Sequence, residues 1–203
     1  MPNFTDLTGL AGIALALLAA AVRLPGVARL QARFKLVFAL AVLGVLATPF
    51  GALSALEYVR GLSGDLSFVS LVLLGCGMCR AFEVLPPVRA TCAQSAVLRS
   101  FAALAAVLLY PFALGLGMFD PYRLGFGNVW LIAALLALAL LAWRKKQTLL
   151  VLALALATLA WSVGWYESNN LWDYLIDPWV AIYALSGLVI PLVMSVLRKV
   201  TRR

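Results

Sequence analysis

Histidine is absent from this 203-residue chain, and cysteine occurs only three times. Without histidine the chain has no Ser–His or Cys–His nucleophile pair and no histidine-ligated zinc or haem. The phosphate-cradling pattern G-x-x-x-x-G-K-[ST] is missing too. These absences exclude many chemistries and leave carboxylate acid–base or carboxylate–metal chemistry as the remaining catalytic routes.

Charge is also scarce, since 12% of the residues are charged and 65% are hydrophobic. A soluble domain is typically about 45–50% apolar. Weakly polar runs long enough to cross a bilayer recur along the chain, and the polar gaps between them are too short for a soluble domain. The composition therefore predicts one transmembrane helical domain over residues 1–203, multi-pass in a bacterial-type inner membrane.

The apolar runs are continuous and do not alternate, which favours helices over the strands of a membrane barrel. The opening MPNFTDLTGL lacks a basic segment, so the first run is expected to be a retained helix and not a signal peptide. We predict an all-α, polytopic bundle of seven spans. The predicted helices cover residues 6–23, 36–57, 65–85, 99–118, 128–143, 148–166 and 178–197.

The basic residues gather in every second connection. On one side lie Arg23, Arg29, Arg33, Lys35, Arg89, Arg99, Arg144, Lys145, Lys146, Arg198, Lys199, Arg202 and Arg203, and on the other lie Arg60 and Arg123. Basic loops stay in the cytoplasm, so this pattern predicts an outside N-terminus and a cytoplasmic C-terminus. The net charge of +8 then reports topology and does not indicate nucleic-acid binding. Every acid except Glu83 falls on the predicted outer side.

Four of the outer acids precede predicted inward-running helices. These are Asp6, Asp65, Asp120 and Asp177. Aspartate is a favoured N-cap because its carboxylate accepts the unpaired amide protons of the first turn and meets the positive end of the helix dipole. We interpret these four as helix caps.

Helix formation leaves Glu57, Glu167 and Asp173 unexplained. We predict a polar ligand-binding site at the outer face, comprising Glu57, Arg60, Arg123, Glu167, Asn169, Asn170, Trp172 and Asp173. Pro49 and Pro111 are expected to kink two helices on the same side and open a vestibule there. The alternative is that the acids are solvated at the headgroups and the aromatics anchor the interface.

The third predicted helix carries ionisable and thiol groups. Arg80 and Glu83 are three residues apart and are predicted to form an intramembrane ion pair on one helix face. Cys76 and Cys79 have a spacing seen in redox pairs and metal sites, but we favour helix packing because the neighbouring glycines make a small-residue face.

Three function classes fit these residues. We rank first a membrane-embedded subunit or scaffold of an envelope complex, because the loops are short and no catalytic group is assigned. The alternatives are a transporter or binder of a polar or lipid-linked solute, and a membrane enzyme that uses outer carboxylates on a lipid-linked or saccharide substrate. The expected partners are membrane lipids and another membrane protein or a lipid-linked substrate. No metal, cofactor or nucleic acid is predicted.

Overall fold

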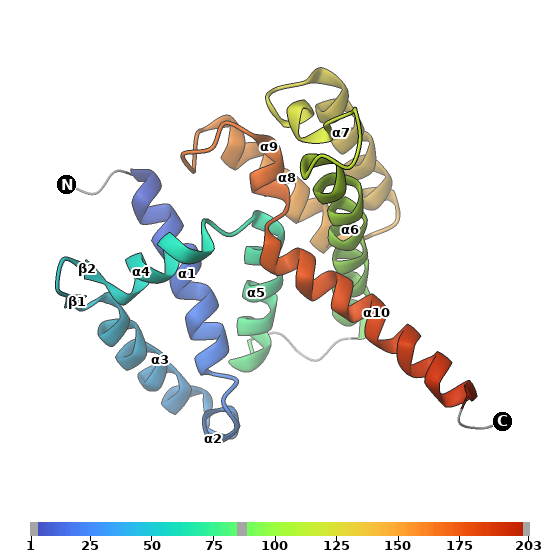
Figure 1. Ribbon diagram of the computed structural model, residues 1–203. Helices are drawn as coiled ribbons and strands as arrows, with labels where there is room; N and C mark the ends of the chain where they lie inside the picture. Colours follow the sequence, from blue (N-terminus) through green and yellow to red (C-terminus); the bar gives the residue numbers. More distant parts are fainter. Residues whose placement is uncertain (1–3, 85–88, 201–203) are drawn as a thin grey trace.

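The computed structural model describes residues 4–84 and 89–200, which are almost entirely helical (Figure 1). The helices are α1 (Phe4–Ala21), α2 (Pro25–Ala28), α3 (Ala32–Ala47), α4 (Ala55–Ser63), α5 (Phe68–Ala81), α6 (Arg89–Ala113), η1 (Pro121–Gly125), α7 (Val129–Arg144), α8 (Thr148–Ser162), α9 (Leu171–Leu175) and α10 (Pro178–Val200). Two-residue strands β1 (Pro49–Phe50) and β2 (Leu53–Ser54) form a small antiparallel hairpin. The predicted all-α class is confirmed.

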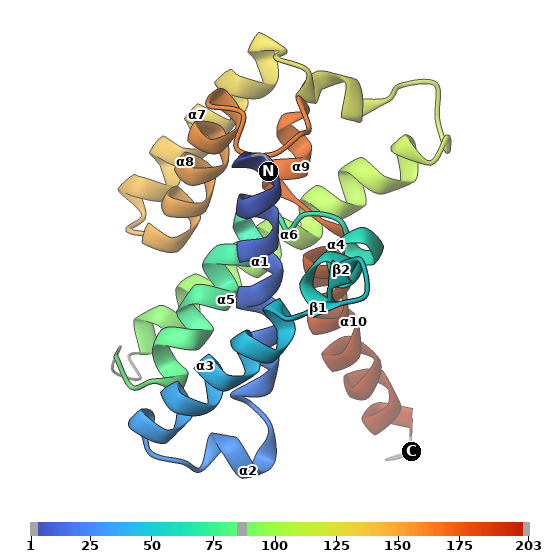
Figure 2. The same cartoon turned by 90° about the vertical axis from the view of Figure 1, so that its left-hand side faces the viewer.

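Helix α1 begins in the upper half of the molecule, and α10 ends at its lower edge, as both ribbon views show (Figure 1, Figure 2). Helix α8 packs against α5, α6, α7 and α9, whereas α1 packs against α3, α4 and α5. Helix α10 packs mainly along α6. We call the end at which α1 begins the acidic end, because Asp6, Asp65, Asp173 and Asp177 lie there. The end at which α1 and α5 finish is the basic end, with Arg23, Lys35 and Arg80.

Helix α8 illustrates how the sequence builds this bundle. Its buried residues repeat at intervals of three and four, which places them on one helix face. They are Leu150, Ala153, Leu154, Ala157 and Ala160. The small alanines let neighbouring helices approach closely. The helix ends at Ser162. Gly164 follows with a positive φ of 65°, which suits a residue without a side chain, and the Trp165 amide donates back to the Ala160 carbonyl.

The buried side chains form two clusters. The larger cluster joins α5, α6, α8, α9 and α10 and includes the fully buried Leu98, Leu154 and Tyr174. The smaller one joins α1 to α4 and the start of α5 through Ile13, Leu56 and Leu66. The separation of the two clusters leaves room between α1 and α10 for a cavity described below.

The second predicted helix, residues 36–57, is wrong at its C-terminal end. Helix α3 finishes at Ala47, because Thr48 before Pro49 adopts an extended backbone and proline has no N–H to continue the ladder. The chain then turns through the hairpin and starts α4 at Ala55. Pro49 therefore ends a helix where we expected it to bend one.

The other boundaries differ less. Helix α6 starts ten residues before the predicted 99 and ends at Ala113, so Pro111 lies in its last turn. The short helices α2, α4, η1 and α9 were not predicted. Within the described residues, two segments are long and apolar enough to cross a membrane, namely Phe4–Ala21 and Ala93–Ala113. The remaining apolar helical segments have 10–17 residues and fall below that length.

Candidate functional site

The polar segment that precedes α10 is held by its own hydrogen bonds. Asn170 is buried and caps α9, accepting from the Trp172 amide at 2.9 Å, while its Nδ2 donates to the Tyr122 carbonyl at 2.9 Å. Trp172 is also buried, and its indole Nε1 donates to the Pro121 carbonyl at 2.9 Å. These two predicted site residues therefore lock α9 onto η1.

Asp173 lies beside them and is partly buried. Its carboxylate accepts from the Tyr122 hydroxyl at 3.0 and 3.1 Å and from the Ser168 hydroxyl. Burial, and next the Asp173 charge, raise the pKa of Tyr122 to about 12, so this phenol stays a donor at neutral pH. The Asp173 carboxylate is therefore hydrogen-bonded within the fold by Tyr122 and Ser168.

Arg60 is the centre of an ion cluster that joins three segments. Its guanidinium donates to Asp65 from Nε at 2.7 Å and from Nη2 at 3.3 Å, and to Asp6 from Nη1 at 2.8 Å. The Glu167 carboxylate reaches only 4.0 Å from Nη2 and is 69% exposed. The hydrogen bond to Asp65, foremost, raises the pKa of Arg60 above its usual range. Gly9 accommodates the cluster, since a Cβ there would overlap the Arg60 Nε and the Asp65 carboxylate.

These contacts correct two of the predicted caps. Asp65 does not cap α5, because Ser67 does so by accepting from the Ser70 amide. Asp6 lies in the first turn of α1 and pairs with Arg60. The other two aspartates do cap helices. Asp120 caps η1, although Asn128 caps the longer α7, and Asp177 caps α10 through the Val180 amide.

Glu57 is explained by local folding. Ser54 accepts from the Glu57 amide, and Glu57 accepts from the Ser54 amide and hydroxyl, which makes a capping box at the start of α4. The Ser54 amide, and then its hydroxyl, hold the pKa of Glu57 below its ordinary value of 4.5. The predicted helix 36–57 would have placed Glu57 at a helix C-terminus. That prediction is wrong, because α3 ends at Ala47 and Glu57 lies in the first turn of α4.

The remaining predicted site residues are at the surface. Arg123, Glu167 and Asn169 are exposed, and the Asn169 backbone carbonyl accepts from the Trp161 indole at 2.8 Å. The structure therefore brings Arg60 near Glu167, and Asn170 and Trp172 onto η1, but it does not gather all eight residues around one cavity.

A small recess of about 310 Å³ does lie at the acidic end. Of the eight predicted residues only Asp173 lines it, together with Asp65, Asp177, Tyr110 and Tyr166 among others. Asp177 is 3% exposed and accepts from the Ser67 amide and hydroxyl and the Ser70 hydroxyl, besides capping α10. Its carboxylate therefore joins the first turns of α5 and α10.

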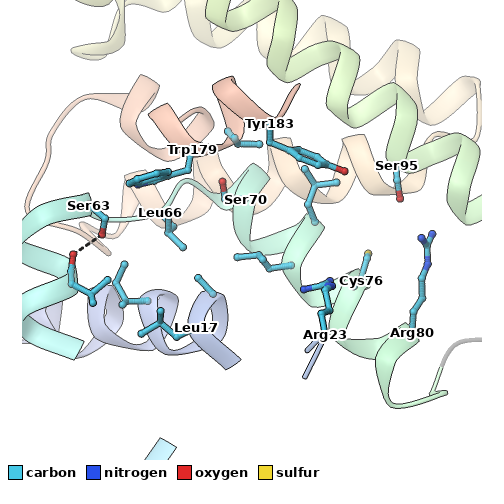
Figure 3. A pocket seen from close by; sticks show the side chains of 17 residues that line it. Leu17, Arg23, Ser63, Leu66, Ser70, Cys76, Arg80, Ser95, Trp179 and Tyr183 are labelled. Carbon is cyan, nitrogen blue, oxygen red and sulfur yellow. Dashed lines mark hydrogen bonds between the residues drawn. The ribbon is translucent and has the colours of Figure 1, made fainter. Parts of the chain in front are cut away.

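A larger cavity of about 580 Å³ lies between α1, α4, α5 and α10 (Figure 3). Its walls are mostly apolar, with Leu17, Leu66, Leu73, Leu74 and Trp179 among the lining residues. Arg23 and Arg80 lie at the basic end of this cavity, near Cys76 on α5. The sequence shows no sign of this cavity, because an apolar residue in a helix can face lipid, protein or a void without any difference in the sequence pattern.

Arg80 and Glu83 are not paired within 4 Å. Helix α5 ends at Ala81, and Glu83 then adopts a left-handed backbone with a φ of 60° while the Val84 amide donates back to the Cys79 carbonyl. This helix-ending turn takes Glu83 off the helical spacing on which the predicted pair depended. The Glu83 side chain is exposed, whereas the Nη2 of Arg80 is buried without a hydrogen-bond partner among the described residues.

Metal-binding groups do not cluster in the described residues. No set of three or more Cys, Asp or Glu side chains is close enough there to hold a metal ion, and the chain has no histidine. Cys76 and Cys79 are free thiols, and Cys76 lines the large cavity. No family model, curated protein or solved structure matches the chain.

Proposed function

We propose that the chain is a multi-pass inner-membrane protein whose seven long helices cross the bilayer, with the N-terminus outside. The exposure of large apolar side chains supports this, because contiguous exposed apolar surface is rare on soluble monomers and common where lipid covers it. Val37 and Val45 on α3 are 65% and 74% exposed, and Leu136 on α7 is 60% exposed. The shortest long helix, α5, spans about 21 Å, so its flanking turns complete the crossing.

Hydrogen bonds between connections support the same topology. At the acidic end, the Thr8 hydroxyl donates to the Trp165 carbonyl and the Tyr166 hydroxyl donates to the Leu66 carbonyl. At the basic end, Lys35 donates to the Ala81 carbonyl, which ties two of the basic connections together. Gln94 likewise joins the start of α6 to the α7–α8 turn by donating to the Lys146 carbonyl. Segments predicted for one face thus bond to segments predicted for that face.

Compartment-sensitive reporters fused to the two termini test this topology. We expect the N-terminal reporter to be active outside and the C-terminal reporter in the cytoplasm. Signals from the same face would mean an even number of crossings and would overturn the seven-span proposal.

The function that we propose is binding of a lipid or lipid-linked solute between the helices. The cavity of about 580 Å³ carries this proposal. Ligand cavities are typically about 300–1,000 Å³, mostly apolar, with a few placed polar groups. Here the apolar walls suit an acyl chain, and two arginines at one end suit a polar head. The transporter alternative rests on the same binding site, with movement of the bound solute across the membrane as a further step.

Mass spectrometry of lipids retained after gentle detergent purification tests the binding. Ala16 lines the cavity, so Ala16→Phe is expected to fill it and lower the retained lipid several-fold. Ala134 is exposed on α7, so Ala134→Phe adds the same ring outside the cavity and is expected to leave retention unchanged. Equal retention by both variants would mean that the lipid coats the outside of the helices only.

The subunit hypothesis keeps one supporting observation. Helix α3 packs only against α1 and α4 among its larger contacts, and it leaves Phe34, Leu36, Val37 and Leu40 exposed. A partner helix covering this face would make the protein part of an envelope complex. Photo-crosslinking from position 37 in native membranes tests it. A discrete protein adduct supports a subunit role, and lipid adducts alone contradict it.

A further inference from the structure

Two arginines, one on α5 and one just after α1, line the basic end of the cavity. Arg80 lies in the last turn of α5, and Arg23 follows α1. Figure 3 shows the Arg80 and Cys76 side chains extending from α5 toward the ribbon that carries Ser95. Arg23 lies against Gly77, since a Cβ on that residue would overlap the Arg23 Nη2. Arg23 therefore lies against α5, while Arg80 extends from α5 along the wall that carries Ser95.

The Nη2 of Arg80 lacks an acceptor among the described residues, although it is buried. A buried donor without an acceptor is costly, and more so when it is charged. An acceptor from outside the chain would remove this cost.

Among the described residues, no carboxylate pairs with Arg23 or Arg80 within 4 Å. The ion pairs seen there at 2.7–4.0 Å join acids to Arg60 at the acidic end. The Arg23 Nη1 donates to the Ala19 carbonyl at 2.7 Å, which fixes the group through a neutral acceptor. Arg99 adds a third cation nearby, with its guanidinium 5.9 Å from the ring of Tyr183, another lining residue.

We propose that Arg23 and Arg80 bind the phosphate group of an anionic phospholipid whose acyl chain occupies the apolar part of the cavity. This inference rests on the proposed lipid-binding function and names the head group. The guanidinium fork matches phosphate oxygens in two parallel hydrogen bonds. Basic pockets between helices on the cytoplasmic side suit anionic lipid head groups, and both arginines lie at the basic end.

Lipid binding to the purified full-length protein tests the proposal by native mass spectrometry. The probes are dioleoylphosphatidylglycerol, dioleoylglycerol with the same chains but no phosphate, and inorganic phosphate. We expect the phospholipid to bind at least about tenfold more tightly than dioleoylglycerol, because a hydrogen bond to a charged group typically contributes that much. Arg80→Gln should remove most of this preference, and Arg80→Lys, which keeps the charge and loses the fork, should remove part of it.

Arg144→Gln is the matched control, because Arg144 is an exposed arginine at the end of α7 that does not line the cavity. It should leave the preference for phosphatidylglycerol unchanged. A second measurement separates ligand binding from folding: without lipid, Arg80→Gln should raise the melting temperature, since the unpaired buried charge is gone. A lower melting temperature would mean that Arg80 has a structural acceptor and would overturn the proposal.

The other outcomes separate the two proposals. Equal binding of both lipids, abolished by Ala16→Phe, would overturn the phosphate assignment and leave the lipid cavity in place. Inorganic phosphate binding as tightly as the phospholipid would make this a site for a soluble anion and overturn the lipid assignment. No binding of either lipid would overturn both.

Discussion

The acidic end and the large cavity are opposite in how their polar groups are used. At the acidic end, acids, amides and phenols are dense in the sequence, and the structure shows Asn170, Asp173 and Asp177 accepting or donating hydrogen bonds within the chain. The cavity has few polar groups, yet one of them, the Arg80 Nη2, is buried without a partner among the described residues. The richer polar region is thus the one already satisfied by the fold.

This contrast teaches that polar density alone does not indicate a ligand site. Helices need their terminal backbone groups paired and their connections held in place, and the polar segment 166–177 does both. A group available to a ligand is instead one whose hydrogen-bonding capacity the fold leaves unused.

The largest effect is expected at Asp177, whose carboxylate serves donors on both α5 and α10. Asp177→Ala leaves several buried donors unpaired and should lower the free energy of unfolding by at least about 3 kcal/mol. Asp120→Ala removes one cap from η1 and should cost about 1 kcal/mol. Denaturation in detergent micelles measures both. Equal losses would mean that Asp177 is only a cap.

Gly9 tests whether the Arg60 cluster fastens α1. Gly9→Ala pushes a methyl group into Arg60 and Asp65, so their hydrogen bonds must shift, and the cost should be about 1–3 kcal/mol. A methyl group added to Gly44 on α3 would meet nothing within 4 Å, so Gly44→Ala should stabilise the helix by up to about 1 kcal/mol. Opposite signs in thermal melts support a tight cluster. A neutral Gly9→Ala would contradict it.

Glu83 tests whether Arg80 has an ion-pair partner at the end of its own helix. Because its backbone is left-handed, Glu83→Gly should raise stability by about 1 kcal/mol. If Glu83 formed an ion pair with Arg80, Glu83→Gly would remove that ion pair and lower the stability instead. Chemical denaturation of the two proteins therefore decides between the helix-ending turn and the pair that the sequence indicated.

The capping box at Glu57 predicts a local pH effect. Its pKa is lower in the folded state than the ordinary 4.5, so its contribution is fully present above pH 4.5 and is lost as the pH falls through the folded pKa. The protection of the α4 amides relative to their intrinsic exchange rates should fall in acid, with the rest of the molecule intact. Glu57→Gln has no carboxylate to titrate, so its α4 protection should not change over this pH range. The same acid response in both proteins would contradict the box.

Glu167 should show the smallest effect. It is 69% exposed and 4.0 Å from Arg60, so Glu167→Gln should change stability by less than about 0.5 kcal/mol. It should not alter lipid retention either, because Glu167 does not line either cavity. A large loss of lipid retention in Glu167→Gln would indicate that the ligand site lies at the acidic end.

Much of the architecture was predictable because helices in this chain follow from continuous apolar runs and strong stop signals. The starts of α8 and α10 were predicted correctly, the latter from Asp177 and Pro178. The α3–α4 boundary was not, because the apolar run continues through Pro49 and hides the hairpin. The site was predicted poorly, since Arg60 finds Asp6 and Asp65 from distant segments, and no local pattern reveals that pairing.

The residues of the chain alone predict the helical class, the cap at Asp177 and the separation of acids from bases along the chain. These are local properties, decided by hydropathy, proline and short polar side chains within a few residues. Only the tertiary structure decided that Glu57 and Asn170 are used in folding and that Arg23 and Arg80 share a cavity. Burial and pairing depend on which helices pack together. Whether a charged group such as Arg80 finds a hydrogen-bond acceptor therefore depends on residues far away in the sequence.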